Sequence, residues 1–209
     1  MSSKILGPSD FTTMPWRNGL GSTIEMLKHQ TDDTFKWRLS MADVTEDGVF
    51  SDFSGYDRCL LLLTGQGLTL TDATGQTWPL SQALDAAHFK GEDAIHAQLT
   101  QGPIKDFNLM TRRKDVTAEV FTSQTSQRQS IPLAGDLFFL YSTEGPTHIA
   151  LTHTYNGHAR QTNDTSQTVP AQHLLQIEAS NAHSVTCDGN GWIGIIIRYR
   201  QSNKNLENK

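Results

Sequence analysis

Residues 59–71 read CLLLLTGQGLTLT, and this stretch decides the fold class. The uninterrupted apolar run Cys59–Leu63 is typical of a β-strand that is covered on both faces. Two glycines then mark a turn, and Leu68–Thr71 alternates between apolar and polar residues, so the stretch predicts a hairpin. Alternation also marks Phe35–Met41, whose odd-numbered residues are all large and apolar. Helical periodicity is scarce elsewhere, and we predict an all-β fold.

The second half of the chain repeats this pattern. The repeated features are an apolar run with a glycine turn, a Gln-Thr-x-Pro segment, and a last strand that ends in arginines. They occur at Leu60–Gly67, Gln76–Leu80 and Phe107–Arg113, and again at Leu137–Gly145, Gln167–Ala171 and Ile193–Arg200. Two β units in tandem account for this repeat. We predict a first unit at 1–121 and a second at 131–200, with a polar linker at 122–130 and a flexible tail at 201–209.

The composition is that of a globular protein. The 209 residues carry a net charge of -5, and 36% are hydrophobic and 19% charged. Nucleic-acid binding needs clustered Lys and Arg, and the densest basic patch is the short segment Thr111–Lys114, so we expect no nucleic-acid partner. The first residues, MSSKILGPSD, contain no apolar signal segment, and Leu60–Leu63 is far shorter than a membrane span. We therefore expect a cytoplasmic protein without a membrane partner.

The segment PWRNGLG, which begins at Pro15, combines a fixed bend with polar side chains. Pro15 restricts the backbone and Asn18-Gly19 is a strong turn signal, so a rigid turn is expected here. One interpretation is a plain turn whose Trp16 fills the core. The other is an anion site, in which Arg17 and Asn18 donate hydrogen bonds and Gly19 lets the backbone approach the ligand.

A polar stripe on one predicted strand is the second candidate for a site. Successive strand residues point to opposite faces, so Asp106, Asn108 and Arg112 share one face with Met110. The exterior of a sandwich and the interior of a ligand-binding barrel can both carry such a stripe. The corresponding strand of the second half carries Ile195–Ile197, so only the first unit is expected to hold a site.

No metal site is predicted. The eight histidines include no H-x-H pair and no H-E-x-x-H motif. His148, His153 and His158 are evenly spaced, but a gap of five residues puts neighbours on opposite faces of a strand. The chain also lacks nucleotide-binding loops and a serine-nucleophile motif. We therefore assign no cofactor and no catalytic residue.

Five segments together resemble the HutD/Ves family of bacterial proteins. They are Pro15–Gly19, Trp37–Val44, Asp47–Arg58, Thr64–Leu70 and Asp106–Arg113. The resemblance implies two tandem cupin-like (RmlC-like) β-barrels in one chain, a bicupin, in agreement with the repeat. Cupins commonly hold a metal through an H-x-H pair and a later histidine, so the lack of that pair implies a metal-free cupin. HutD relatives are associated with modulating histidine utilisation, and Ves relatives with cold and stress response.

The polar stripe with its arginines predicts a protein that binds a small anionic metabolite. The resemblance implies that it is metal-free, with urocanate and formylglutamate as the expected ligands and a modulating role. The predicted ligand-binding residues are Arg17, Asn18, Gly19, Arg38, Ser40, Arg58, Asp106, Asn108 and Arg112. Arginine suits carboxylates because its planar guanidinium can bind both oxygens. One alternative is a metal-independent cupin enzyme acting on a small carboxylate, with Asp106 or Asp57 as general base. Another is a non-catalytic protein-interaction scaffold whose barrel is packed shut. We also expect a homodimer.

Overall fold

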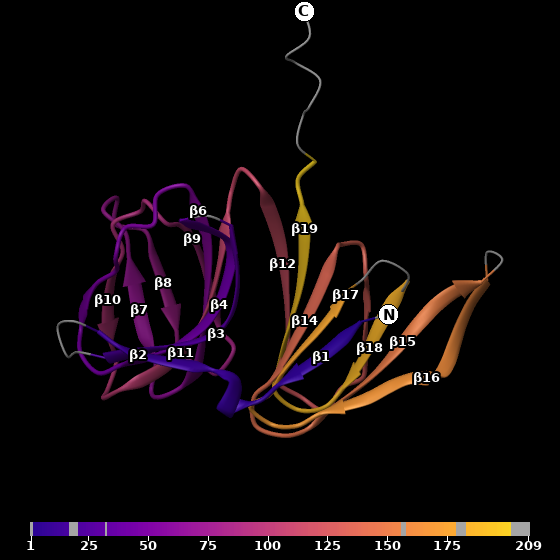
Figure 1. Cartoon of the computed structure of the whole chain (residues 1–209). Helices are drawn as coiled ribbons and strands as arrows, with labels where there is room; N and C mark the ends of the chain where they lie inside the picture. Colours follow the sequence, from indigo (N-terminus) through magenta and orange to yellow (C-terminus); the bar gives the residue numbers. More distant parts are fainter. Residues whose placement is uncertain (1, 17–20, 32, 156–157, 179–182, 202–209) are drawn as a thin grey trace, which may run out of the picture.

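The computed structural model describes residues 2–16, 21–31, 33–155, 158–178 and 183–201, and of 153–155 and 158–165 it describes the backbone alone. In this part of the chain, strands form four antiparallel sheets arranged as two barrels that lie side by side (Figure 1). The predicted all-β fold is confirmed. None of the helices among the described residues has the length and apolar character that crossing a membrane requires.

An N-terminal strand and a 3-10 turn precede the first barrel, whose strands are at most eleven residues long. The N-terminal segment forms β1 (Ser3–Leu6) and η1 (Pro8–Asp10). The strands of the first barrel are β2 (Thr12–Pro15), β3 (Gly21–Thr31), β4 (Thr34–Val44), β5 (Gly48–Val49), β6 (Tyr56–Thr64), β7 (Leu68–Thr71), β8 (Thr77–Leu80), β9 (Ala86–Lys90), β10 (His96–Leu99) and β11 (Ile104–Arg112). The second barrel follows with β12 (Val116–Ser123), β13 (Gln129–Pro132), β14 (Leu137–Ser142), β15 (Thr147–Tyr155), β16 (His158–Val169), β17 (Leu174–Glu178), β18 (Ser184–Asp188) and β19 (Trp192–Tyr199).

The strand order confirms the predicted tandem repeat. The sheets of the first barrel run β2-β3-β4-β11-β6-β9 and β5-β10-β7-β8. Those of the second run β1-β17-β14-β19-β12 and β13-β18-β15-β16. Each strand from β4 to β11 therefore has a counterpart eight strands later in the same place in its sheet. The N-terminal strands β2 and β3 extend the first barrel alone.

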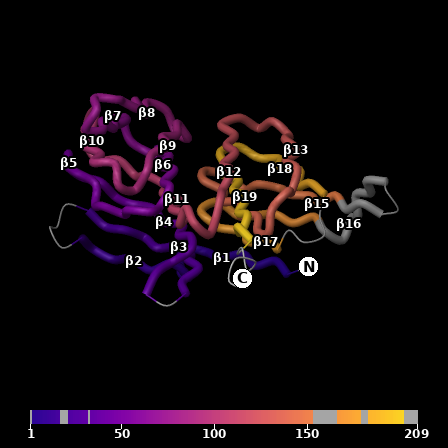
Figure 2. The backbone as a smooth tube through the Cα atoms, turned by 90° about the horizontal axis from the view of Figure 1, so that it is seen from above, coloured from indigo at the N-terminus to yellow at the C-terminus, as the bar shows by residue number. Residues whose placement is uncertain are grey.

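The strand pairing differs from the predicted boundaries at two places. β1 lies within the segment 1–121, yet it pairs with β17 of the second barrel, as Figure 2 shows. β12 pairs with β19 along its whole length, from Val116 to Ser123. The predicted linker at 122–130 is correspondingly shorter, because β12 ends at Ser123 and β13 begins at Gln129. Local sequence could not indicate either pairing, since both partners lie more than 50 residues away.

The hairpin predicted at residues 59–71 is wrong. β6 pairs with β9 and β11, whereas β7 pairs with β8 and β10 in the other sheet. The connecting turn crosses between the sheets with Gly65 and Gly67 at φ values of +111° and +106°. A Cβ at Gly65 would lie 2.6 Å from the side chain of Ile104. The turn therefore needs glycine both for its backbone conformation and for its close packing.

Three apolar clusters hold the barrels together. One cluster lies inside each barrel. The third, which we call the inter-barrel core, lies between the large sheets of the two barrels. The predicted burial of Cys59–Leu63 on both faces is confirmed: Leu60 and Leu62 point into the first barrel, and Leu61 points into the inter-barrel core. Trp37 also lies in the inter-barrel core, where its ring contacts Phe139 of the second barrel at 4.9 Å between centroids. The large sheet of the first barrel is thus held in place by its packing against the second barrel.

Candidate functional site

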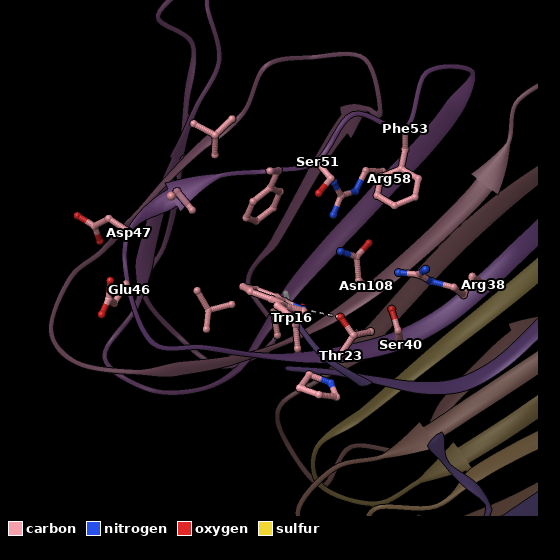
Figure 3. A pocket seen from close by; sticks show the side chains of 18 residues that line it. Trp16, Thr23, Arg38, Ser40, Glu46, Asp47, Ser51, Phe53, Arg58 and Asn108 are labelled. Carbon is pink, nitrogen blue, oxygen red and sulfur yellow. Dashed lines mark hydrogen bonds between the residues drawn. The ribbon is translucent and has the colours of Figure 1, made fainter. Parts of the chain in front are cut away.

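A cavity of about 730 Å³ opens between the two sheets of the first barrel. This volume is typical of small-molecule sites. Figure 3 shows that its polar side chains gather at one end, where Arg38, Arg58, Asn108 and Ser40 point toward one another. Apolar walls separate this end from exposed carboxylates at the opposite rim. We call this space the first-barrel cavity.

Three neighbouring strands, β4, β11 and β6, position the polar end in rows. Arg38 and Arg58 both lie opposite Met110, so they flank the central strand. In the next row Ser40 lies opposite Asn108. Adjacent strands are about 4.8 Å apart, so the two arginines start roughly 10 Å from each other and their long side chains can converge on one group. Successive residues of a strand point to opposite faces. The odd-numbered residues of these strands therefore face the inter-barrel core, and the even-numbered polar residues named above face the cavity.

Arg58 is a buried cation that forms no ion pair among the described residues. Only 7% of it is exposed, and its guanidinium carbon lies 5.0 Å from the ring centroids of Phe50 and Phe89. Its Nε has no hydrogen-bond partner among the described residues. Burial lowers the pKa of Arg58 to about 10, with the charge of Asp106 opposing this effect and that of Arg38 adding to it. The rings stabilise the cation in part, and the charge of Asp106 does so only partly, because burial still lowers the pKa of Arg58.

Arg38 has a similar environment with more solvent. Its guanidinium carbon lies 5.6 Å from the ring centroid of Phe35 and 5.7 Å from that of Phe53. Phe53 is also 5.7 Å from the Arg58 guanidinium, so one ring lies beside both cations. Burial lowers the pKa of Arg38, and the charge of Glu25 opposes this. Within the described residues, neither arginine forms an ion pair.

Asp106 and Asn108 complete the polar end from the central strand. Both are at least nine-tenths buried, and Oδ1 of each lacks a hydrogen-bond partner in the described part of the chain. Burial raises the pKa of Asp106 to about 7, and the charge of Arg58 limits this rise. Buried polar atoms are nearly always paired in proteins. The unpaired atoms here therefore point to a missing hydrogen-bond partner in the cavity.

The structure brings five of the predicted ligand-binding residues together around the cavity: Arg38, Ser40, Arg58, Asp106 and Asn108. Arg112 does not join them. By alternation it is on the same face of β11 as Asp106 and Asn108, but it lies at the end of the strand, beyond the cavity. There it donates hydrogen bonds to Asp115 and Thr34.

Arg17, Asn18 and Gly19 lie outside the described residues, so their roles stay predictions. The chain does reverse here, because β2 pairs with β3 and the backbone N–H of Trp16 donates to Gly21 O at 2.9 Å. The Trp16 ring lines the cavity and donates from Nε1 to Thr23 at 2.8 Å. Pro15 and Trp16, which precede the predicted turn, therefore form part of the cavity wall.

The phenylalanines around the arginines were not predicted as part of the site. Phe50 and Phe53 lie in the connection between β5 and β6, where no strand periodicity marks a face. Backbone hydrogen bonds hold both residues, from Phe50 N to Ile95 O at 2.8 Å and from Phe53 N to Gly91 O at 2.9 Å. Aromatic residues close to a predicted inward arginine are the signal that could have indicated them.

The cavity does not fit the metal that many cupins hold. No histidine or cysteine is among its lining residues, and two guanidinium groups would repel a cation beside Asp106. Elsewhere in the described chain, no group of three potential metal ligands converges. His148 is exposed and hydrogen-bonds to Thr168, while the side chains of His153 and His158 lie outside the described ones. Asp57, the other predicted base, is exposed and pairs with Arg113 at 2.7 Å.

The second barrel has apolar rings where the first has its polar groups. By strand register, Phe138 takes the position of Arg58 and Trp192 that of Asp106. Gly194 takes the position of Asn108, and a Cβ there would lie 3.3–3.4 Å from the side chains of Trp192 and Phe138. These rings fill the interior. Around these residues, the interior of the second barrel is packed, as the sequence predicted for the second unit.

Comparison with known proteins gives matches over most of the chain. The family model described as HutD matches residues 8–194. An uncharacterized 21.2 kDa protein in the hutC 3' region of Pseudomonas putida is 40% identical over 109 residues, which are 51% of this chain and 57% of that protein. Protein Ves of Escherichia fergusonii is 38% identical over 117 residues, which are 53% of this chain and 60% of Ves. The aligned part thus spans well under two thirds of these curated relatives.

Solved structures match over nearly the whole chain. A conserved protein of unknown function from Pseudomonas aeruginosa PAO1 has a TM-score of 0.80 at 28% identity, covering 95% of this chain and 100% of that one. HutD from Pseudomonas fluorescens SBW25, in a formate condition, has a TM-score of 0.77 at 25% identity, covering 96% and 100%. Lactobacillus farciminis oxalate decarboxylase, in a formate complex, has a TM-score of 0.61 at 7% identity, covering 96% and 87%. The last likeness concerns the fold alone.

Proposed function

The chain belongs to the HutD family and has two cupin-like barrels, and from this premise we propose that it binds a small carboxylate metabolite in the first-barrel cavity without a metal. Its role is that of a cytoplasmic sensor that modulates a pathway and performs no reaction step. The anion enters at the polar end, between Arg38 and Arg58. Asn108 and Ser40 hydrogen-bond its remaining polar atoms.

One observation carries this proposal: two arginines point into a cavity, and neither forms an ion pair within the described part of the chain. A buried cation without an anion costs free energy, and proteins rarely retain one without a use. A bound carboxylate would supply the missing charge and accept charge-assisted hydrogen bonds, for which the Nε atoms of both arginines are free among the described residues. The flanking aromatic rings exclude water and so strengthen that attraction.

The names of the relatives support a link to histidine utilisation, since one lies beside hutC and another is HutD. The Ves relatives leave a stress-related role as the other branch. Urocanate and formylglutamate, which are small carboxylates of the histidine pathway, are therefore the ligands we propose to test. Each can place a carboxylate between the arginines within the volume of the cavity.

Calorimetric titration and thermal shift with urocanate, formylglutamate, glutamate and histidine test the proposal. A ligand at about 100 times its Kd stabilises the protein by about 2.7 kcal/mol, which raises the Tm by roughly 5–10 °C in a chain of this size. Arg58→Gln and Arg38→Gln should each remove the shift. Arg112→Gln is the matched control, because Arg112 lies on the same sheet but outside the cavity, and it should bind as the wild type does.

Arg38→Lys separates charge from shape, since lysine keeps the charge but not the planar fork. We expect a partial loss of affinity for Arg38→Lys. The proposal is contradicted if none of the four metabolites binds to the wild type, or if Arg112→Gln weakens binding as much as Arg58→Gln does.

A metal-independent enzyme acting on a small carboxylate is the second candidate, and the burial of Asp106 favours it. Its pKa of about 7 is suitable for a general base near neutral pH. Loss of turnover in Asp106→Asn with binding retained would favour catalysis. Absence of turnover with every metabolite that binds would leave the sensor. A scaffold with a closed barrel is not supported for the first barrel, because its interior is open and polar.

A further inference from the structure

Asp106 is the one carboxyl group that is buried at the polar end of the first-barrel cavity. It is 2% exposed and lines the cavity one row beyond Asn108 on β11. The pairing of β11 with β6 shifts register between Lys105 and Asp106, near the start of β11. Its Oδ1 has no partner among the described residues. An ionised carboxylate here would face an incoming anion with one oxygen unsatisfied.

We infer that Asp106 binds the ligand as a neutral carboxylic acid, so that a carboxylate ligand enters the first-barrel cavity together with one proton from solvent. This inference rests on the proposed function and narrows its ligand class. The ligand carries one carboxylate for the arginines and a second hydrogen-bond acceptor, such as the oxygen of an amide, a formyl group or another carboxylate, or the unprotonated nitrogen of an imidazole ring. That second acceptor receives the hydrogen of the protonated Asp106.

The charges around Asp106 determine the direction of this effect. Arg58 on β6 and Lys105 on its own strand favour its ionised form, while Asp43 on β4 disfavours it. Asp43 is largely neutralised by Lys105, whose Nζ lies 2.6 Å from its Oδ1. Burial outweighs Arg58 even in the empty cavity, since the pKa is about 7.

A bound carboxylate changes this balance in one direction. It adds a negative charge beside Asp106 and takes up part of the attraction of Arg58 and Arg38. It also displaces water, which removes solvation of the ionised form. Each of these effects raises the pKa of Asp106 further, so the complex holds the proton at pH values where the empty protein has lost it.

The experiment is calorimetric titration with formylglutamate and with urocanate in two buffers of different ionisation enthalpy. Formylglutamate is the cleaner probe, because its own carboxyl groups titrate at about pH 4 and do not exchange protons in the pH range of the experiment. With full protonation in the complex and a free pKa of about 7, roughly 0.9 proton should be taken up per ligand at about pH 8. The apparent Kd should rise by about 30-fold from about pH 6 to about pH 8.5.

Asp106→Asn should show no proton uptake with formylglutamate and a Kd that does not vary over this range. Asp57→Asn is the matched control, because it removes an exposed carboxyl on β6 outside the cavity, and it should take up the proton as the wild type does. For urocanate, the difference between wild type and Asp106→Asn removes the contribution of the imidazole ring.

The wild-type measurement decides the inference even if Asp106→Asn fails to fold. Binding with no proton uptake and a constant Kd overturns this inference and leaves the proposed function intact. Undiminished proton uptake by a folded Asp106→Asn variant also overturns it, because the proton then goes elsewhere. If neither probe binds at any pH, the proposed function fails and the inference fails with it.

Discussion

Replacement of Arg58 by methionine should make the unliganded protein more stable while it abolishes carboxylate binding. The perturbation removes a cation that is 7% exposed and keeps a flexible apolar side chain of similar length. If the arginine is retained for a ligand, its charge is a cost in the empty protein. If it is retained for the fold, its loss should destabilise the chain.

The pKa of Arg58 gives the size of this cost. Burial and neighbouring charges lower it from 12.5 to about 10, and at about 1.36 kcal/mol per pKa unit the charged form costs about 3 kcal/mol. Because the group is charged in both folded and unfolded chains below about pH 10, this cost is constant around neutral pH. The contacts with Phe50 and Phe89 offset about 1–2 kcal/mol of it, and methionine keeps part of that contact. We expect a net gain of about 1–2 kcal/mol.

Urea denaturation followed by tryptophan fluorescence measures the gain at about pH 7 and again at about pH 8.5. The gain should be smaller at the higher pH, because loss of Arg58 raises the pKa of Asp106 further and makes its ionised form more costly. Arg113→Met is the control, because Arg113 is one-third exposed and pairs with Asp57 and Glu92. That variant should lose no more than about 1 kcal/mol. A loss of more than about 1 kcal/mol in Arg58→Met, or unchanged affinity for the carboxylate, would refute the reasoning, since Arg58 would then be part of the fold and not of a site.

Three other perturbations test the same structure. Phe107→Ala removes a fully buried ring from the inter-barrel core and should lower the free energy of unfolding by about 3–5 kcal/mol in urea denaturation; a loss below about 1 kcal/mol would contradict the packing. Gly194→Val forces methyl groups toward Trp192, 3.3 Å from the Cβ position, and should cost about 1–3 kcal/mol with no change in carboxylate affinity by calorimetry. Asp106→Asn removes a carboxyl whose pKa burial raises from 3.8 to about 7, so its cost is absent below about pH 4, grows up to about pH 7 and is constant above. The variant should therefore gain Tm over the wild type at about pH 8 but not at about pH 4.

Sequence alternation predicted which residues share a face because the period of a strand is a local property, but it left open whether that face is an exterior or the interior of a barrel. Arg38 and Ser40 alternate with Trp37 and Leu39, so the burial of the apolar face places the polar face in the barrel. The same logic holds for Asn108 on β11. It fails at Arg112, because alternation says which face a residue takes but not where along the strand the cavity ends.

Alternation could not indicate which strands pair. Residues 59–71 contain two strands and a tight glycine turn, which is the local pattern of a hairpin, yet the two strands join different sheets. The choice is made by partners far along the chain, since β11 pairs with β6 and β10 with β7. β1 likewise pairs with β17, about 170 residues later. A single stretch of sequence cannot reveal such pairing between distant strands. It becomes apparent only when the strand order of the two repeated units is compared.

The two barrels together explain how one of them can keep an uncompensated charge. Both have the same strand order, and at equivalent positions Arg58 is replaced by Phe138 and Asp106 by Trp192. The fold thus permits apolar rings at these positions, and the first barrel departs from this with a buried cation and a buried carboxyl group.

Such a departure lowers stability, and the inter-barrel core is in a position to offset it. The strands β4, β6 and β11 carry the cavity side chains on one face and bury Leu39, Leu61 and Phe107 against the second barrel on the other. Each fully buried side chain of this kind contributes about 1.5–3 kcal/mol, so a few of them offset the cost of about 3 kcal/mol at Arg58. If this is the role of the second barrel, Phe107→Ala should unfold the protein more readily when the cavity is empty than when a carboxylate fills it. Raising the carboxylate concentration should then recover much of the lost Tm, whereas the same variant in an Arg58→Met background should show no such recovery.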